Sequence, residues 1–492
     1  MGSENVFTAA PSPESLGIPS QAILNFLQRI DAERIPMHGF LLVRHNKIAA
    51  EGYWAPWSAE RQHRMYSVSK SFVALAIGMM IDEGRLTLDA RVADYFPDKL
   101  PAKLHPWVAG STVRDLLTMA TAHSTTSYTR DDADWVWTFF NKVPSHPPGT
   151  IFAYDTAATV VLTALVEQLA GKPFLDYMRP RFLDRIGFSA DAWCVRTPEG
   201  GSWGGSGVIC TLRDMASVGL ACLNGGLWGA ERVLPEAYVG AATAKQIDNS
   251  LSGNDGYGYQ IWREKANGFS FRGMGSQYAI CFPDKAFLFA CIADTQGAPT
   301  SSTIPAVMWE ELYPHLADAP LPADRAAHAA LADKIEQLAV LPLPGSPDAL
   351  IASEVNGAWY ALEENPMGIT RMRLTFNGDQ GQSDQGTWEY TNSQGDNVLH
   401  FGIGRVQSGK FPQRNYFGEQ IGVIPGFEYD CLASAAWIDA QTFNLEVYIT
   451  DNYLGGLRIS FAFKGAEIGV FMTKQAEWFL DEYSGFAGGK RV

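Results

Sequence analysis

One apolar segment with a lysine near its start constrains the fold of this chain more than any other feature. Residues 65–84 read MYSVSKSFVALAIGMMIDEG, and the expected helix, which begins near Ser69, is apolar nearly all round. Such a helix is typical of the buried centre of a protein. Because an unpaired ammonium is costly to bury, we expect the pKa of Lys70 to fall, which makes its amine available as a base.

Ser67 lies three residues before Lys70, a spacing that places both side chains on one face of a helix. Its hydroxyl then sits at the positive, N-terminal end of the helix, beside a group that can accept its proton. This arrangement predicts an activated serine nucleophile. The alternative is a lysine that extends along a surface helix into water, but residues 71–80 offer little polar face to support it.

A second segment, HPPGTIFAYDTAATVVLTALVEQLAG at residues 146–171, predicts a turn followed by another apolar helix. Asp155 and Thr156 are candidate caps for that helix. Tyr154 would hold its phenol at the helix start, where the helix dipole and a nearby lysine favour the phenolate. We therefore interpret Tyr154 as a candidate proton shuttle. A core tyrosine with a satisfied hydroxyl is the alternative interpretation.

A third segment, FSFRGMGSQYAICF at residues 269–282, is a strand pattern that contains glycines. Strand glycines often mark the close approach of another backbone or a ligand, so Gly273 and Gly275 would let a substrate pair with this strand. A backbone N–H here, together with that of Ser67, predicts an oxyanion hole. A simple β-bulge is the alternative.

The order of the patterns predicts an α+β region followed by a small β domain. A helical pattern at 12–34 precedes two strands at 38–54, residues 111–223 are mostly helical, and strand patterns return at 256–294. A Pro- and Ala-rich passage with one helix then leads to short alternating segments after Gly345, which suggest an antiparallel sandwich or barrel. We place a catalytic domain at 1–320, a helical linker at 321–345 and the β domain at 346–492.

Composition excludes several classes of protein. A length of 492 residues predicts two or three domains, and a net charge of -15 argues against nucleic acid as the main partner. The six cysteines show neither disulfide nor metal-ligand spacing, so no metal and no organic cofactor is indicated. The start of the sequence has no signal-peptide pattern, and no stretch has the apolar length of a membrane span. We expect a cytoplasmic protein whose oligomeric state stays open.

These three segments, in this order, resemble the SxxK serine hydrolases, namely class C β-lactamases, low-molecular-weight penicillin-binding proteins and their esterase and amidase relatives. The resemblance covers roughly residues 15–315 and includes STVRDLLTMATAH and WGGSGVICTLRDMASVGLACLNGG. It implies a β-lactamase/transpeptidase-like fold, an antiparallel sheet flanked by helices with a helical subdomain. It also implies that Ser67 is acylated, that Lys70 is the base, and that Tyr154 transfers protons to the leaving group and the deacylating water.

Two positions depart from the family pattern. Thr156 stands where Tyr-x-Asn has its Asn, and FRGMGSQ resembles the Arg-Gly-x-x-x-Gln version found near 6-aminohexanoate-dimer hydrolases. In that alignment Arg272-Gly273 replaces Thr-Gly and the Met274 N–H joins the oxyanion hole, whereas an alignment shifted by two chooses Ser276. The missing strand lysine disfavours β-lactamase and carboxypeptidase activity, and the side chain of Arg272 is a doubtful substitute because of its direction in a strand.

The resemblance assigns substrate contacts to six residues, Thr156, Arg272, Gly273, Gly275, Ser276 and Trp135. Trp135 belongs to DWVWTFF, where the family builds pocket walls, and helix core is its alternative role. The C-terminal part resembles the lipocalin-like β-domains attached to some members of the family.

We predict a serine hydrolase that forms an acyl-enzyme with a small ester, amide or peptide. An acyltransferase of the same family and a non-catalytic ligand sensor are the alternatives.

Overall fold

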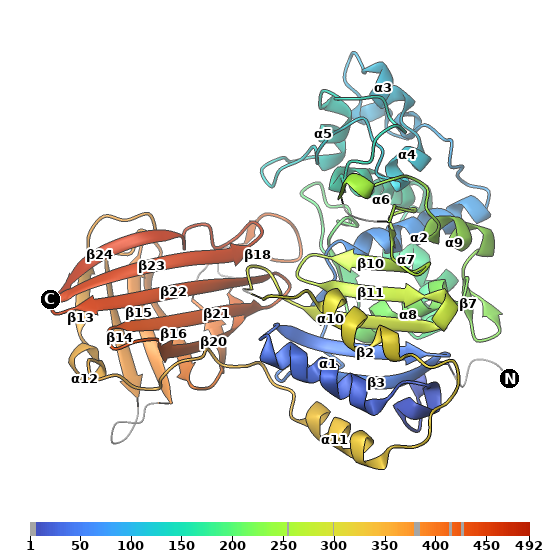
Figure 1. Ribbon diagram of the computed structural model, residues 1–492. Coiled ribbons are helices and arrows are strands. Elements are labelled where there is room, and N and C mark those ends of the chain that lie inside the picture. The colour runs from blue at the N-terminus through green and yellow to red at the C-terminus, as the bar shows by residue number, and fades with distance from the viewer. Residues whose placement is uncertain (1–5, 253–254, 299, 378–383, 413–415, 425–427) are drawn as a thin grey trace. The chain divides into compact units, whose positions relative to one another are not determined.

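The computed structural model describes residues 6–252, 255–298, 300–377, 384–412, 416–424 and 428–492 (Figure 1). The chain divides into two units, each with its own core. The first unit comprises residues 1–295, 300–339 and 419–421, and the second comprises 296–299, 340–418 and 422–492. The helix of the predicted linker, α11 (Arg325–Glu336), therefore belongs to the first unit.

The first unit is built on a seven-stranded sheet. In spatial order its strands are β1 (Thr8–Ala9), β3 (Lys47–Tyr53), β2 (Met37–Arg44), β12 (Phe287–Ala293), β11 (Gln277–Phe282), β10 (Phe269–Gly273) and β9 (Trp262–Arg263). Only β1 and β3 pair in parallel. The two strands predicted at 38–54 are β2 and β3, and the turn between them contains His45 and Asn46 with positive φ angles of 49° and 65°. Every residue of β2 and β12 is buried, so the core lies at these central strands.

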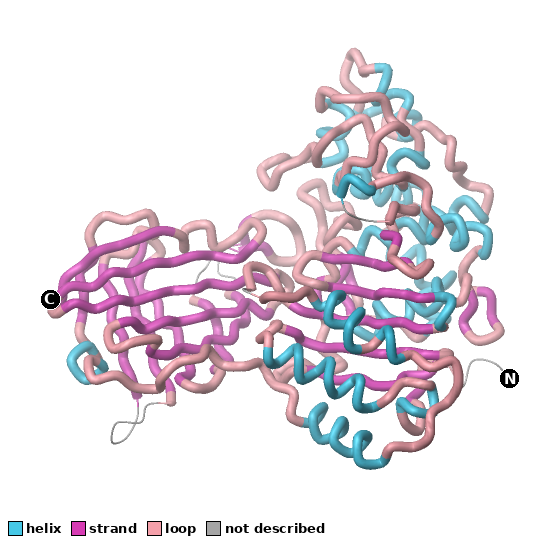
Figure 2. The backbone as a smooth tube through the Cα atoms, viewed as in Figure 1, coloured by secondary structure: helices cyan, strands magenta, loops and turns pink. Residues whose placement is uncertain are grey.

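Helices cover both faces of this sheet (Figures 1 and 2). Successive residues of β12 show the two faces, because side chains alternate along a strand. The ring of Phe289 packs edge-on against Phe26 of α1 (Ser20–Ala32), while Leu288 lies close to Gly219 of α8 (Leu212–Leu223). Helices α10 (Ile304–Glu311) and α11 pack against α1.

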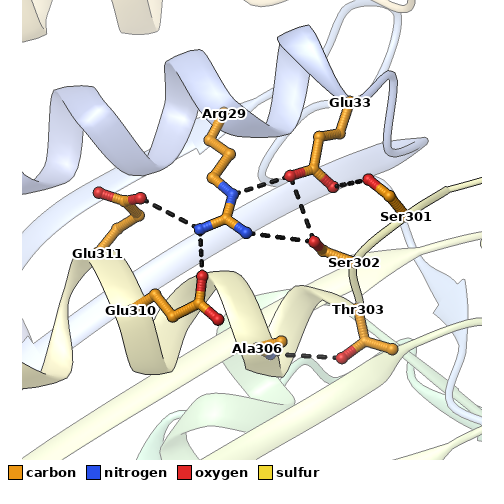
Figure 3. Close-up of polar contacts among 8 residues, drawn as sticks. All are labelled: Arg29, Glu33, Ser301, Ser302, Thr303, Ala306, Glu310 and Glu311. Atoms are coloured by element: carbon orange, nitrogen blue, oxygen red, sulfur yellow. Dashed lines mark hydrogen bonds and ion pairs between the residues drawn. The ribbon is translucent and has the colours of Figure 1, made fainter.

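Arg29 of α1 joins that helix to α10 (Figure 3). Its guanidinium donates to Glu33 at 2.8 Å and also contacts Glu310 and Glu311. The same group donates to the Ser302 hydroxyl at 3.2 Å, just before α10 begins. Several charges sharing one guanidinium form a network, which holds helix positions better than an isolated surface pair.

Two apolar helices fill the centre of the first unit. In α2 (Val68–Asp82) every residue from Val68 to Met80 is buried, as the all-round apolar pattern predicted. It packs against α6 (Thr156–Ala170). The smaller helices are α3 (Pro106–Gly110), α4 (Val113–Leu117), α5 (Trp135–Asn141), α7 (Phe174–Met178) and α9 (Glu236–Thr243). The short strands are β4 (His63–Arg64), β5 (Trp193–Cys194), β6 (Val208–Cys210), β7 (Leu227–Trp228) and β8 (Glu231–Arg232).

The second unit is a closed barrel of nine strands. They are β13 (Trp359–Leu362), β14 (Arg371–Asn377), β15 (Gln385–Asn392), β16 (Gly395–Ile403), β20 (Tyr429–Trp437), β21 (Thr442–Thr450), β22 (Leu454–Lys464), β23 (Glu467–Ala476) and β24 (Gly485–Arg491). A parallel pairing of β16 with β20 closes the ring, at Gly402 with Ser434 and Ile403 with Ala435. Closure removes exposed strand edges, so the barrel rather than the sandwich is the observed form of the predicted β domain.

Smaller elements accompany the barrel. Strand β17 (Gln407–Phe411) pairs with β20, β18 (Tyr416–Phe417) pairs with β19 (Val423–Ile424), and α12 (Ala352–Val355) precedes β13. The alternating segments noted in the sequence after Gly345 correspond to barrel strands β13, β14, β15, β16, β21 and β22. The sequence patterns missed β20, β23 and β24. Strand β20 lacks alternation and β24 contains three glycines, which explains two of these omissions.

One predicted strand is largely wrong. Residues 256–262, GYGYQIW, contribute only Trp262 to β9. Tyr257 instead bridges back to Trp262, and Gln260 adopts a φ of 57°. The alternating aromatic residues here lie in a tight turn, and their side chains are buried. Alternation with a period of two therefore does not distinguish this buried turn from a strand.

Within the described residues, none of the helices alone has the length and apolar character of a bilayer span. One bent pair, Thr156–Ala170 with Phe174–Ile186, satisfies that test by length and composition when both parts are taken together.

Candidate active site

The candidate nucleophile Ser67 lies in a turn between a short strand and a buried helix. Met65 donates its N–H to Val208 O at 2.8 Å, which continues the pairing of β4 with β6. Tyr66 then adopts a φ of 48°, uncommon for a residue with a bulky side chain. Ser67 follows as the first residue before α2. Strained backbone of this kind often occurs at functional sites.

Lys70 reaches Ser67 within one turn of α2. Its Nζ lies 3.0 Å from Ser67 Oγ and donates to the Gly205 carbonyl at 2.6 Å. The Lys70 residue is only 1% exposed, so its amine is removed from bulk water. The structure thus brings together the hydroxyl and the amine in the geometry that a nucleophile and its base require.

Tyr154 completes the cluster from the start of α6. The centre of its ring lies 5.0 Å from Lys70 Nζ. Burial raises the pKa of Tyr154 to about 12, and a hydrogen bond with Ser67 offsets this only in part. This direction favours the phenol over the expected phenolate. Loss of hydration outweighs the lowering by Ser67, and a phenol whose pKa is raised in this way can serve as a proton donor.

The start of α6 is held by the side chains of the two residues that follow Tyr154. Asp155 caps the helix by accepting from the Ala157 N–H at 2.8 Å and from the Thr121 hydroxyl at 3.2 Å. Burial raises the pKa of the Asp155 carboxyl to about 6. Thr156 is the first helical residue and not a cap. A Cβ at Gly205 would meet the Thr156 methyl at 2.6 Å, so Thr156 contacts the residue that accepts from Lys70.

The turn between β10 and β11 approaches the nucleophile through a glycine. A Cβ at Gly273 would lie 2.3 Å from the Met65 carbonyl, so only glycine allows this approach. Gly275 and Ser276 follow with φ angles of 75° and 73°. Met274, whose N–H is the predicted second oxyanion donor, lies at the end of this hairpin and is 37% exposed. That role for the Met274 N–H stays a prediction.

Gln277 holds this turn together. Its buried side-chain amide donates to Met274 O at 2.8 Å and to Ala293 O at 2.7 Å, and it accepts from the Ala293 N–H at 3.2 Å. The Gln of the Arg-Gly-x-x-x-Gln pattern thus links the hairpin end to β12. The sequence showed this residue but not its partners.

Arg272 does not present an unpaired cation to a substrate. Its guanidinium donates to Glu264 at 2.6 Å and to the Ser270 hydroxyl at 2.9 Å. The same group lies over the ring of Trp262 at 5.1 Å. The predicted substrate contact of Arg272 therefore competes with a carboxylate already in place.

Two other predicted substrate contacts have different surroundings. Trp135 is fully buried, stacked on Tyr128 at 3.9 Å and edge-on to Trp203 at 5.2 Å. Its proposed place in a pocket wall is therefore wrong, and it belongs to the core of the helical region. The Ser276 hydroxyl shares a hydrogen bond with Thr295 at 2.7 Å.

Several residues that contact this cluster could not be found from the sequence. Trp262 stacks on Tyr154 with ring centres 5.5 Å apart, and the Gly205 carbonyl accepts from Lys70. Ser69 and Ser71 fasten α2, since the Ser69 hydroxyl accepts from the Val208 N–H at 3.0 Å and the Ser71 hydroxyl donates to Gln260 O at 2.8 Å. The WGGSG segment was recognised by resemblance, but nothing in its pattern showed which carbonyl faces the lysine.

The first unit combines an antiparallel sheet covered by helices with a buried Ser-x-x-Lys helix, and a tyrosine lies beside the serine and the lysine. These features define the class of β-lactamase-like hydrolases. The sequence comparison agrees, because the profile of the Beta-lactamase family matches residues 25–312. The chain belongs to that family.

Two relatives illustrate the similarity. The 6-aminohexanoate-dimer hydrolase of Paenarthrobacter ureafaciens is 28% identical over 269 residues, which is 48% of this chain and 67% of that protein. A solved structure, the putative 6-aminohexanoate-dimer hydrolase from Bacillus anthracis, aligns with a TM-score of 0.50 at 17% identity, covering 63% of this chain and 87% of that one. The structural likeness concerns the fold.

Proposed function

We propose that this protein is a serine hydrolase that forms an acyl-enzyme with a small ester, amide or peptide. The observation that carries the proposal is the position of Lys70 Nζ, 3.0 Å from Ser67 Oγ, with the centre of the Tyr154 ring 5.0 Å from the same amine. The 28% identity to a 6-aminohexanoate-dimer hydrolase supports hydrolysis of a small molecule as the reaction.

The proposed reaction has two halves. Ser67 Oγ attacks the substrate carbonyl while its proton passes to the neutral amine of Lys70. Collapse of the tetrahedral intermediate breaks the bond to the leaving group, which takes a proton from the Tyr154 phenol, and Lys70 then returns a proton to Tyr154. Water attacks the acyl-enzyme in the second half by the same transfers in reverse, which restores Ser67 and releases the acid.

The surroundings of Arg272 support a substrate without an obligatory carboxylate. The guanidinium of Arg272, near the end of β10, is already paired with Glu264. A substrate carboxylate would have to displace that carboxylate, at the cost of leaving a half-buried Glu264 without its partner. Neutral esters and amides avoid this cost.

The test is a Ser67→Ala variant assayed with short p-nitrophenyl esters. We expect hydrolysis to fall to the uncatalysed rate while the thermal transition stays unchanged. A fluorophosphonate probe should add its mass to Ser67 of the parent protein and to no residue of the variant. Undiminished turnover in Ser67→Ala would remove Ser67 from its role, and an unlabelled parent would favour the non-catalytic sensor.

A further inference from the structure

Trp262 links the proton donor of the site to an ion pair on the sheet. Its ring stacks against Tyr154 with an angle of 26° between the planes and also contacts Tyr257 edge-on at 4.9 Å. Phe152 packs against both Tyr257 and Trp262, with its ring centre 6.0 Å from that of Trp262. Tyr154 therefore lies against a cluster of aromatic rings whose centre is Trp262.

The Trp262 ring is itself held from the neighbouring strand. The Arg272 guanidinium lies 5.1 Å from the ring centre, within the range of a cation–π contact. Glu264 accepts two hydrogen bonds from that guanidinium, from Nη2 at 2.6 Å and from Nε at 3.1 Å, and it accepts a third from the Ser270 hydroxyl at 2.5 Å. The guanidinium is consequently fixed in one orientation, and the ring beneath it is fixed as well.

The position of a proton donor matters most when the leaving group is a poor one. A phenol must lie within hydrogen-bond reach of the departing atom, and small misplacements of a catalytic group reduce rates strongly. Resting on the proposed function, we propose that Trp262 is a positioning residue for Tyr154, and that Arg272 and Glu264 hold Trp262 rather than bind an anionic substrate. None of these three residues needs to touch the substrate.

The test compares p-nitrophenyl, phenyl and ethyl esters of one acyl group in a Trp262→Leu variant. Nitrophenolate leaves with little help, whereas an alkoxide requires protonation. We expect the fall in kcat/KM to be about tenfold or more larger for the ethyl ester than for the p-nitrophenyl ester. Most of this loss should lie in kcat. Trp262→Phe keeps a stacked ring and should recover most of the lost rate.

A double variant separates positioning from general damage. In a Tyr154→Phe background the phenol is already absent, so Trp262→Leu should then add little to the loss on the ethyl ester. Trp309→Leu is the matched control, because Trp309 of α10 also belongs to an aromatic cluster, with its ring centre 4.2 Å from that of Tyr313. That control should leave the leaving-group dependence unchanged.

The outcomes distinguish this inference from the proposed function. A parent protein that neither hydrolyses these esters nor takes up a fluorophosphonate on Ser67 contradicts the proposed function. An active parent in which Trp262→Leu slows all three esters by one common factor contradicts the inference alone. If Trp262→Leu does not fold, Glu264→Gln releases Arg272 without removing a ring, and an unchanged leaving-group dependence in that variant overturns the inference.

Discussion

At the scale of single residues, the surroundings of Ser67 depend on atoms that tolerate almost no added volume. Gly273 is the sharpest case, since this last residue of β10 lies against the carbonyl of Met65. Because Gly273 carries a hydrogen where other residues carry a Cβ, the end of β10 can approach the nucleophile turn this closely.

We expect Gly273→Ala to reduce both activity and stability. Its Cβ would lie 2.3 Å from a backbone oxygen that cannot rotate away, so the strand must shift. Overpacking of this kind costs roughly 1–3 kcal/mol, and the displaced turn should lower kcat/KM at least about tenfold. Urea unfolding and ester hydrolysis measure the two effects. Gly469→Ala, on a barrel strand with open space at the Cβ, is the control, and parent-like kinetics of Gly273→Ala would contradict the prediction.

The pairing of Arg272 leads to a prediction about charge selectivity. The parent should show no preference for an ester that carries a carboxylate over its neutral analogue, because Glu264 already neutralises the guanidinium. Glu264→Gln leaves the shape but removes the competing charge, so the ratio of kcat/KM for the anionic ester over the neutral one should rise severalfold. A strong preference for the anionic ester in the parent would show that Arg272 does bind substrate.

At the scale of elements, the starts of helices carry the site. Ser67 precedes α2, and Tyr154 precedes the Asp155 cap of α6. Both apolar helices are identifiable from their sequences, and so is the cap, because an acidic residue before an apolar run is a helix-start signal. The contact between the two helix starts is not identifiable, because it joins segments more than eighty positions apart.

The cap at Asp155 predicts a particular dependence of stability on pH. Burial raises the pKa of its carboxyl to about 6, above the usual value of 3.8. The folded state therefore binds this proton more tightly than the unfolded state, and the contribution of Asp155 to stability is lost as pH rises through this range.

We expect Asp155→Asn, which cannot titrate, to gain stability relative to the parent between about pH 4 and about pH 7. Urea unfolding of both proteins at a series of pH values measures the difference. A difference that stays constant with pH would show that the Asp155 carboxyl has an ordinary pKa in the folded protein.

At the scale of the whole molecule, a buried histidine pair acts in the opposite direction. His38 Nδ1 and His63 Nε2 lie 2.9 Å apart, and the His38 ring stacks on Trp57. Burial lowers the pKa of His63 to about 4 and that of His38 well below its usual value. Both rings are neutral in the folded protein, so their contribution to stability is present above pH 6.5 and is lost as pH falls toward 4.

The parent should consequently lose stability on acidification, on the order of 3 kcal/mol from His63 alone. Replacing both partners by apolar residues, as in His38→Phe with His63→Leu, should flatten this part of the pH dependence. The exposed His400 on β16 provides the control variant His400→Gln, which should keep the parent slope. An equally steep acid loss in the double variant would assign the effect to other groups.

The two units show how far the sequence predicted the whole molecule. Composition and strand spacing indicated a β domain after Gly345, but they left barrel and sandwich open. The choice depends on a parallel pairing of β16 with β20, at Gly402 with Ser434. Neither strand carries a local signal for that partner, since main-chain pairing between distant strands depends on the assembled sheet.

The spacing along the chain fixes the relation of Ser67 to Lys70, because the helical repeat places residues three apart on one face whatever surrounds them. It also determined that their helix is central, because an apolar surface on all sides must be buried. The groups around those two residues come from the folding of distant segments: the Gly205 carbonyl, the phenol of Tyr154 and the Trp262 ring that stacks on it. These contacts join distant segments, and close packing in three dimensions sets them rather than any period along the chain.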